Sequence, residues 1–385
     1  FTVAASPSSD SREKVRRALE AGWGGIVFKT TALPQHSPKL AEPNMAGLSY
    51  AGKPQFAFYN IDLISERTVE EIQEDIAYFK QLYPDRRFIG SIMAAGEDEW
   101  IELVHRLEEA GADMIECSMS CPQGEHSIAD EGKKASNAIP AADRELMRTT
   151  TQTILRARKK NTPVIVKMTP NVTDLVDVAR GAVEGGADAL CCIDTVRGFI
   201  GIDLETGYPK LNVNGLSTWG GLSGPAVKPI ALGCVSKLTK ELDIPVAGVG
   251  GVSNWQDAAE FLLLGARNVQ VCTAISRYGF GMVQSMQKGL LRYMEQKGFT
   301  SLDAMVGKSL PYLVDHSELS RDNHLHCSID ETACLKCGSC ATACQDAGFG
   351  ALHHEKGSVP TLDKAVCRGC GVCQSVCPRD CITLR

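Results

Sequence analysis

Hydrophobic and polar positions follow two different periodicities along the first 300 residues. Eight short runs rich in β-branched residues predict strands at residues 2–5, 25–29, 87–93, 114–117, 163–167, 189–194, 245–249 and 269–273. Longer amphipathic stretches between them predict helices at residues 13–21, 69–82, 97–110, 144–159, 174–184, 229–241, 254–264 and 278–296. Eight strand–helix pairs are typical of a (β/α)8 (TIM) barrel. A doubly wound sheet is the alternative, but the eight repeats, with no G-x-G-x-x-G turn after a strand, favour the barrel.

Long segments follow three of the predicted strands, at residues 30–67, 118–143 and 197–228. In a barrel these segments lie at the C-terminal face, where barrel enzymes keep their active sites. The alternating pattern ends near residue 300, so we expect the barrel to span residues 1–300. We expect residues 301–326 to form a linker and residues 327–385 to form a second, smaller domain.

Charge and cysteine content narrow the class of protein. The net charge of −6 over 385 residues argues against nucleic acid or an anionic membrane as a partner. No apolar run is long enough to span a membrane, and no signal peptide opens the chain. Eight of the 16 Cys lie outside the two motifs described next, a pattern typical of the reducing cytoplasm. The chain begins at Phe1 inside a strand-like run, so we expect further residues before it in the native protein.

Two cysteine motifs near the end of the chain predict a pair of [4Fe–4S] clusters. Each has the spacing C-x2-C-x2-C-x3-C, in which three thiolates bind one cluster and the fourth binds the other. One predicted ligand set is Cys334, Cys337, Cys340 and Cys377, and the other is Cys367, Cys370, Cys373 and Cys344. Zinc knuckles and disulfides are the alternatives, and this spacing in a long chain is typical of neither. Residues 327–385 are therefore predicted to be a ferredoxin-like domain that carries single electrons.

Glycines and a helix start at the last two predicted strands suggest a phosphate site. Gly250 and Gly251 follow the seventh strand, and Cys272 and Thr273 follow the eighth, each just before a helix. Backbone N–H groups at such positions bind phosphate in barrel enzymes. The alternative is that Gly250 and Gly251 only form a turn.

Two lysines end predicted strands and point to an anionic ligand. Lys167 ends the fifth strand and Lys29 ends the second. A cation in the mouth of a barrel is costly unless an anion or a reduced flavin uses its charge. The alternative for either lysine alone is an exposed ammonium group on a buried stem.

Cys121 is the candidate acid. It follows the fourth strand and opens a polar segment, residues 123–138. A thiol with an ordinary pKa of about 8.5 is protonated near neutral pH. It can therefore protonate a carbon atom opposite the face that receives a hydride. Cys117, four residues earlier, is expected to be a core residue of the strand.

Several segments resemble the catalytic subunit family of dihydropyrimidine dehydrogenase, which is related to the dihydroorotate dehydrogenases. The similar segments are residues 21–29, 91–93, 111–117, 120–123, 167–171, 220–224, 228–232 and both cysteine motifs. The resemblance implies an FMN-binding barrel with Cys121 as the active-site acid. It also implies FMN-binding positions at Ala4, Ala5, Lys29, Lys167, Thr195, Gly221, Gly224, Gly250, Gly251, Cys272 and Thr273.

The residues that bind substrate depart from this family. The family binds uracil through three Asn side chains, and the resemblance places the substrate beside Gly96, Ser118, Asp194 and Thr195. No Asn follows the Ser-Ile-Met segment at residues 91–93, while Ser118 and Asp194 stand where Asn is expected. An ionised Asp only accepts hydrogen bonds, so donors to a pyrimidine carbonyl are lost. The substrate is therefore either a dihydropyrimidine or pyrimidine, or a related cyclic or conjugated carbonyl compound.

Two functions remain open from the sequence. The first is an FMN and iron–sulfur oxidoreductase that reduces an activated C=C bond. Because no nicotinamide-binding motif is found, its electrons would come from NAD(P)H through an FAD-containing iron–sulfur partner subunit, in a homodimer or heterotetramer. The second is an electron-transfer subunit of a larger complex with a catalytically idle barrel.

Overall fold

The computed structural model describes residues 1–50, 53–119, 141, 143–322 and 325–385. The chain divides into two compact units, Phe1–Leu313 and Val314–Arg385. The predicted linker, residues 301–326, is divided between them: Met305 is fully buried in the core of the first unit, and the Gly307 N–H donates to the Leu262 carbonyl at 2.9 Å. Among the described residues, no helix is long and apolar enough to span a membrane.

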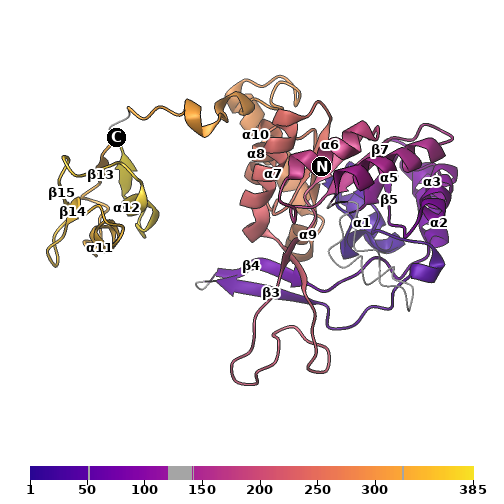
Figure 1. The fold of residues 1–385 in the computed structure, drawn as a ribbon, viewed down its shortest axis with the longest axis horizontal. Helices are drawn as coiled ribbons and strands as arrows, with labels where there is room; N and C mark the ends of the chain where they lie inside the picture. Colours follow the sequence, from indigo (N-terminus) through magenta and orange to yellow (C-terminus); the bar gives the residue numbers. More distant parts are fainter. Residues whose placement is uncertain (51–52, 120–140, 142, 323–324) are drawn as a thin grey trace. The chain divides into compact units, whose positions relative to one another are not determined.

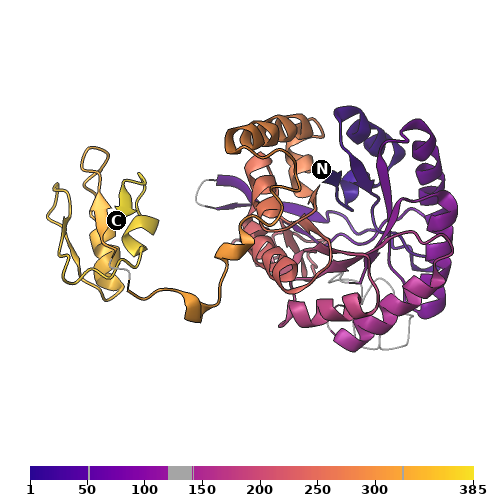
Figure 2. The ribbon, with the colours of Figure 1, turned by 90° about the horizontal axis from the view of Figure 1, so that it is seen from above.

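The first unit is built around a closed barrel of eight parallel strands, which confirms the predicted fold (Figure 2). The strands follow the order β1-β12-β11-β8-β7-β6-β5-β2 around the barrel. They are β1 (Thr2–Val3), β2 (Gly25–Val27), β5 (Arg87–Ile92), β6 (Met114–Ser118), β7 (Val164–Met168), β8 (Ala189–Cys192), β11 (Val246–Val249) and β12 (Asn268–Val271). Strands β1, β2, β5, β8 and β12 end one or two residues before the predicted limit.

Helices surround this barrel (Figure 2). They are α1 (Arg12–Ala21), α2 (Val69–Leu82), α3 (Glu97–Ala110), α5 (Arg144–Ala157), α6 (Leu175–Glu184), α7 (Lys228–Glu241), α8 (Trp255–Leu263), α9 (Thr273–Tyr278) and α10 (Met282–Lys297). The predicted helix at residues 278–296 is wrong at its start. A separate helix, α9, ends at Tyr278, and Gly279 then adopts a φ of 73°, a conformation that ends a helix.

Strand parity separates two hydrophobic layers. Val164 and Val166 of β7 belong to the large core between the strands and the helices, whereas Ile165 lies in a smaller core with Val27 and Cys191. Successive side chains of a strand point to opposite faces, so this smaller core fills the barrel interior. The parity of each strand therefore decides which polar residues point inward.

A second sheet, not predicted from the sequence, forms in the segments that follow β2 and β8. Its strands β3 (Met45–Tyr50), β4 (Lys53–Asn60), β10 (Gly220–Ser223) and β9 (Val196–Gly198) pair in that order, all antiparallel. Figure 1 shows the β3–β4 hairpin extending away from the helices. Pairing of β4 with β10 brings Asn60 opposite Gly221, so residues 161 positions apart meet.

The described residues of the second unit form two small sheets and two α-helices. Strand β13 (Cys327–Ile329) pairs antiparallel with β16 (Ile382–Leu384), and β14 (Leu352–His353) pairs with β15 (Thr361–Leu362). Helices α11 (Ser339–Asp346) and α12 (Val372–Ser375) each begin within a cysteine motif. The buried core of this unit consists mostly of cysteines with a few aliphatic residues, so little apolar area is available to stabilise it without a bound group.

Candidate functional site

A buried polar group lies inside the barrel at the carboxyl ends of the strands. Glu116 of β6, Lys167 of β7 and Gln270 of β12 each alternate with residues of the outer core and therefore point inward. Lys167 Nζ lies 3.7 Å from Glu116 Oε1, and Gln270 Nε2 donates to Glu116 Oε2 at 3.1 Å. Glu116 is completely buried, so its charge depends on these partners.

Lys167 keeps its positive charge in this environment. Burial by itself lowers the pKa of a lysine, but the negative charges of Asp194 and Glu116 raise the pKa of Lys167 above its ordinary value. The ammonium group therefore carries a fixed positive charge at the barrel mouth across the physiological pH range.

A cavity of about 590 Å³ opens beside Lys167 and Gln270. Most of the positions that the family resemblance assigns to the cofactor line it. These are Ala4, Ala5, Lys167, Thr195, Gly224, Gly250, Gly251, Cys272 and Thr273, together with Asp194 from the predicted substrate group. They come from the carboxyl ends of β1, β7, β8, β11 and β12 and from the turn after β10.

One glycine in the lining of the cavity leaves no room for a side chain. Gly251 has a φ of 77°, and a Cβ there would lie 2.8 Å from the Lys228 nitrogen and 2.9 Å from the Gly224 oxygen. Thr273, at the start of α9, donates from its hydroxyl to Ser223 Oγ at 2.9 Å, which joins the two sides of this cradle. Such a cradle of glycine backbone suits a phosphate.

Gln270, which lines the cavity, has a buried polar atom that lacks a partner among the described residues. Gln270 Oε1 is buried and accepts no hydrogen bond within the described part of the chain, although its amide nitrogen is fixed by Glu116. A buried acceptor of this kind is costly unless a ligand donates to it. A phosphate cradle, a fixed cation and a free amide oxygen fit a flavin mononucleotide, which carries a phosphate, a ring that becomes anionic on reduction, and N–H donors.

Other predicted positions lie outside the lining of this cavity. Lys29 follows β2 and forms ion pairs with Asp62 at 3.0 Å and Asp10 at 3.9 Å. Burial raises the pKa of Asp62, and Lys29 offsets part of this effect. Ser118 ends β6 opposite Lys167, and Gly221 lies in β10. Gly96 precedes α3 and is exposed.

The predicted acid Cys121 lies outside the described residues. The end of β6 is described, and there Cys117 is fully buried in the outer core, as the sequence predicts. Burial raises the pKa of the Cys117 thiol well above its ordinary value, so this residue stays a neutral core side chain.

Two asparagines that sequence reasoning missed lie beside predicted site residues. Asn60 Nδ2 donates to the Gly221 carbonyl at 3.2 Å, and Asn171 Nδ2 donates to the Thr195 carbonyl at 3.0 Å. Asn171 lies three residues after the end of β7, in the segment that contains Lys167, so its position was a usable signal. Asn60 ends β4, a strand that the sequence did not reveal. Neither asparagine stands at the three positions where the family has Asn, so the expectation of altered substrate-binding residues stays a prediction.

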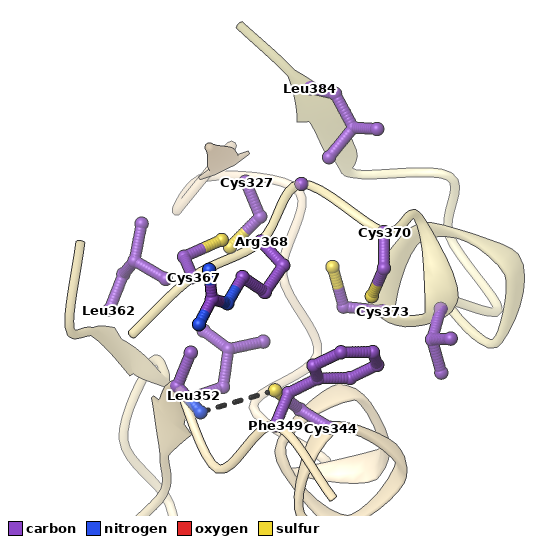
Figure 3. A pocket seen from close by; sticks show the side chains of 13 residues that line it. Cys327, Cys344, Phe349, Leu352, Leu362, Cys367, Arg368, Cys370, Cys373 and Leu384 are labelled. Carbon is purple, nitrogen blue, oxygen red and sulfur yellow. Dashed lines mark hydrogen bonds between the residues drawn. The ribbon is translucent and has the colours of Figure 1, made fainter. Parts of the chain in front are cut away.

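The cysteine motifs of the second unit surround two separate cavities. One cavity, of about 330 Å³, is lined by Cys344, Cys367, Cys370 and Cys373 (Figure 3). The other, of about 340 Å³, is lined by Cys334, Cys337, Cys340 and Cys377. The structure thus gathers the two predicted ligand sets, including the exchange of the fourth cysteine between motifs. Each cavity also contains a thiol that the sequence analysis did not assign: Cys327 in the first and Cys381 in the second.

The arrangement of sulfur atoms fits a cluster better than a single ion. In the part of the chain that the structure describes, no three His, Cys, Asp or Glu side chains converge closely enough to hold one metal ion. Four thiols placed around a wider cavity suit the corners of a cubane cluster. Backbone N–H groups already point at the sulfurs: Ala351 donates to Cys344 Sγ (Figure 3) and Lys336 to Cys334 Sγ, both at 3.3 Å.

Comparisons with protein families agree with this division of the chain. Residues 46–294 match the family described as dihydroorotate dehydrogenase, and residues 327–384 match a 4Fe-4S dicluster domain. The first family implies a flavin, and the dicluster domain implies two [4Fe–4S] clusters.

Individual relatives cover most of the chain. The NAD-dependent dihydropyrimidine dehydrogenase subunit PreA of Escherichia coli K12 is 38% identical, over 100% of this chain and 92% of its own length. The chloroplastic dihydropyrimidine dehydrogenase (NADP(+)) of Arabidopsis thaliana is 33% identical over 83% of this chain and 76% of its own. The catalytic subunit of dihydroorotate dehydrogenase B (NAD(+)) from Methanothermobacter thermautotrophicus is 35% identical over 79% and 92%, respectively.

Proposed function

The chain belongs to the dihydroorotate dehydrogenase family, carries a 4Fe-4S dicluster domain and acts as an oxidoreductase on CH–CH bonds. From this premise we propose that it is the catalytic subunit of an FMN and iron–sulfur enzyme that reduces an activated C=C bond. The observation that carries the proposal is the presence, in one chain, of the barrel cavity beside Lys167 and two cavities each lined by four cysteines.

The barrel residues would hold the cofactor and keep water from it. The FMN positions in this proposal are Ala4, Ala5, Lys29, Lys167, Thr195, Gly221, Gly224, Gly250, Gly251, Cys272 and Thr273. The glycine cradle would bind the phosphate, and Lys167 would offset negative charge on the ring. When bound, the flavin supplies two-electron chemistry toward the substrate and one-electron exchange with the clusters.

Cys121 would give its thiol proton to the carbon of the C=C bond that does not receive the hydride. A neutral thiol suits this role because its ordinary pKa lies above neutral pH. Gly96, Ser118, Asp194 and Thr195 would surround the substrate. Asp194 Oδ1 accepts from its neighbour's backbone, Thr195 N–H, at 2.8 Å, which fixes the carboxylate in place.

A partner subunit would supply the electrons. Relatives are named as subunits, and two names include NAD(+) or NAD dependence. The strand ends of this chain carry no G-x-G-x-x-G turn, so we propose that an FAD-containing iron–sulfur partner oxidises NAD(P)H. The partner would pass electrons to the clusters. The chain itself would form a homodimer, or a heterotetramer with the partner.

Pyrimidines are the first substrates to test. Two relatives are named dihydropyrimidine dehydrogenases, and the amides of Asn60 and Asn171 lie beside Gly221 and Thr195. Asp194 and Ser118 instead favour a related cyclic or conjugated carbonyl compound that donates a hydrogen bond. Turnover of uracil, thymine and dihydrouracil by the complex with its partner distinguishes the two. Efficient turnover of any of them supports a pyrimidine substrate, and turnover of none supports the related carbonyl compound.

An idle barrel is the second candidate, because a fold alone does not establish catalysis. Cys121→Ala separates the two functions. If the barrel is catalytic, the variant loses at least about 100-fold in turnover, as expected for loss of a general acid, and keeps its FMN and clusters. Cys234→Ala, a change on α7, is the matched control and should leave turnover unchanged. Equal turnover by wild type and Cys121→Ala would instead support the idle barrel.

A further inference from the structure

Each cluster cavity contains five thiols, although a [4Fe–4S] cluster binds only four. The fifth thiol is Cys327 in the cavity of Figure 3 and Cys381 in the other cavity. Neither belongs to a C-x2-C-x2-C-x3-C motif, and nothing in the family spacing assigns them a role. The Sγ atom of Cys381 lies within hydrogen-bond distance of the Sγ atom of Cys377, a predicted cluster ligand.

Cys381 lies directly beside one corner of its cluster site. Its Sγ atom is 3.3 Å from the Sγ atom of Cys377, and the residue is only 8% exposed. Its backbone is held independently of any metal: the Cys381 carbonyl accepts from Asp330 N–H at 2.8 Å, and β16, which pairs with β13, begins at the next residue. The sheet therefore places this thiol at the site whether or not the cluster is bound.

The chemistry of a bound cluster decides which sulfur donates. A ligand thiolate such as Cys377 has no S–H, so in the contact with Cys381 only Cys381 can be the donor. A hydrogen bond to a ligand sulfur stabilises the reduced cluster, which carries the greater negative charge, and so raises its reduction potential.

On the premise of the two proposed clusters, we propose that Cys381 is a fifth member of the site formed by Cys334, Cys337, Cys340 and Cys377. While Cys377 binds iron, Cys381 donates its S–H to the Cys377 sulfur. When Cys377 is absent, Cys381 takes its place: its thiol proton goes to solvent, and one Fe–S bond forms to the iron atom that Cys377 would have bound. No electron is gained or lost in this exchange.

The first test measures iron and acid-labile sulfide in protein purified without air, with electron paramagnetic resonance as a second readout. Wild type is expected to contain eight iron atoms per chain, and Cys377→Ala is expected to keep all eight. The double variant Cys377→Ala/Cys381→Ala is expected to lose at least one iron atom. Cys337→Ala is the matched control, since Cys337 lies at another corner, hydrogen-bonded to Ser339 rather than to a cysteine, and it should also lose iron.

Loss of iron from Cys377→Ala alone, with the resonance signal of a three-iron cluster, would overturn the reserve-ligand role. Wild-type protein without eight iron atoms would instead contradict the proposed clusters themselves, so the two failures are distinguishable.

The second test measures the reduction potentials of both clusters by titration followed by paramagnetic resonance. Cys381→Ala should lower the potential of one cluster, whereas Cys381→Ser, which keeps a donor, should stay closer to wild type. Cys327→Ala is the matched change in the other cavity, and it should leave the potential of the cluster beside Cys381 unchanged. Identical potentials in wild type and Cys381→Ala would overturn the hydrogen-bond role.

Discussion

Lys167 shows how one residue links the barrel fold to its chemistry. Strand parity turns its side chain inward, and Glu116 and Asp194 keep it charged in a buried environment. The sequence predicted this residue because a lysine that ends an apolar strand is unusual. It did not predict Glu116 or Gln270, because each lies within an apolar strand and gains its meaning only when the barrel closes and brings β6, β7 and β12 into contact with one interior.

Replacing Lys167 by Gln should weaken FMN binding. A charge-assisted interaction in a buried site contributes about 1.5–3 kcal/mol, so the dissociation constant should rise about 10- to 100-fold. Quenching of flavin fluorescence during titration of the FMN-depleted protein measures this change. Lys237→Gln, at an exposed position on α7, is the control and should bind FMN as wild type does. Equal affinity in Lys167→Gln and wild type would remove Lys167 from the cofactor site.

Gly251→Ala should empty the same site by a different physical route. A Cβ there would collide with the backbone at Lys228 and Gly224, and the φ of 77° is unfavourable for alanine. We expect purified Gly251→Ala to contain less than about a tenth of the wild-type FMN, a loss of about 1.4 kcal/mol or more. Gly233→Ala, a change on α7, is the control, because a Cβ at this position would meet no atom within 4 Å. Full FMN content in Gly251→Ala would contradict the phosphate cradle.

At the scale of elements, the sequence was informative where periodicity was strong. Helices α2 and α3 begin and end at the predicted residues, since each combines an amphipathic pattern with a clear start or stop signal. The four strands β3, β4, β9 and β10 were missed: β3 and β4 form a local hairpin, but the sheet is completed only when β4 pairs with β10, which lies far away in the sequence. The same pairing placed Asn60 beside Gly221, which explains why that amide could not be foreseen.

Glu108, near the end of α3, should couple stability to pH. Its carboxylate accepts backbone N–H groups of Lys159 at 2.7 Å, Lys160 at 3.0 Å and Thr162 at 3.4 Å, and so anchors the turn between α5 and β7. Burial alone raises the pKa of Glu108, but these hydrogen bonds lower it below its ordinary value. A lowered pKa means that the carboxylate stabilises the fold above the unfolded pKa, about 4.3, and that this contribution is lost as pH falls through the folded value.

Glu108→Gln should therefore lower the free energy of unfolding by about 2–3 kcal/mol at pH 7, because a neutral amide leaves buried N–H donors poorly satisfied. The difference from wild type should shrink as pH falls from about 4.3, the unfolded pKa, through the lower folded pKa, because the wild-type carboxyl also becomes neutral there. Thermal unfolding followed by circular dichroism at several pH values measures both effects. Glu109→Gln, the neighbouring helix position, is the control. A difference that is the same at pH 7 and below pH 4 would contradict the role of charge.

The whole molecule consists of two compact units, which match two different families. The barrel unit and the dicluster unit were both predictable, since one has a repeated strand–helix pattern and the other a fixed cysteine spacing. The choice of substrate was not predictable, because it depends on a few polar atoms contributed by separate strands and turns. Ser118 and Asp194 stand where the family has Asn, while the amides of Asn60 and Asn171 donate to the Gly221 and Thr195 carbonyls.

The cofactor stoichiometry of the full chain, purified without air, decides whether one chain holds both a flavin and two clusters. We expect one FMN, eight iron atoms and eight acid-labile sulfides per chain, with a flavin absorption band that bleaches on reduction. A colourless protein without flavin and without acid-labile sulfide would contradict this expectation.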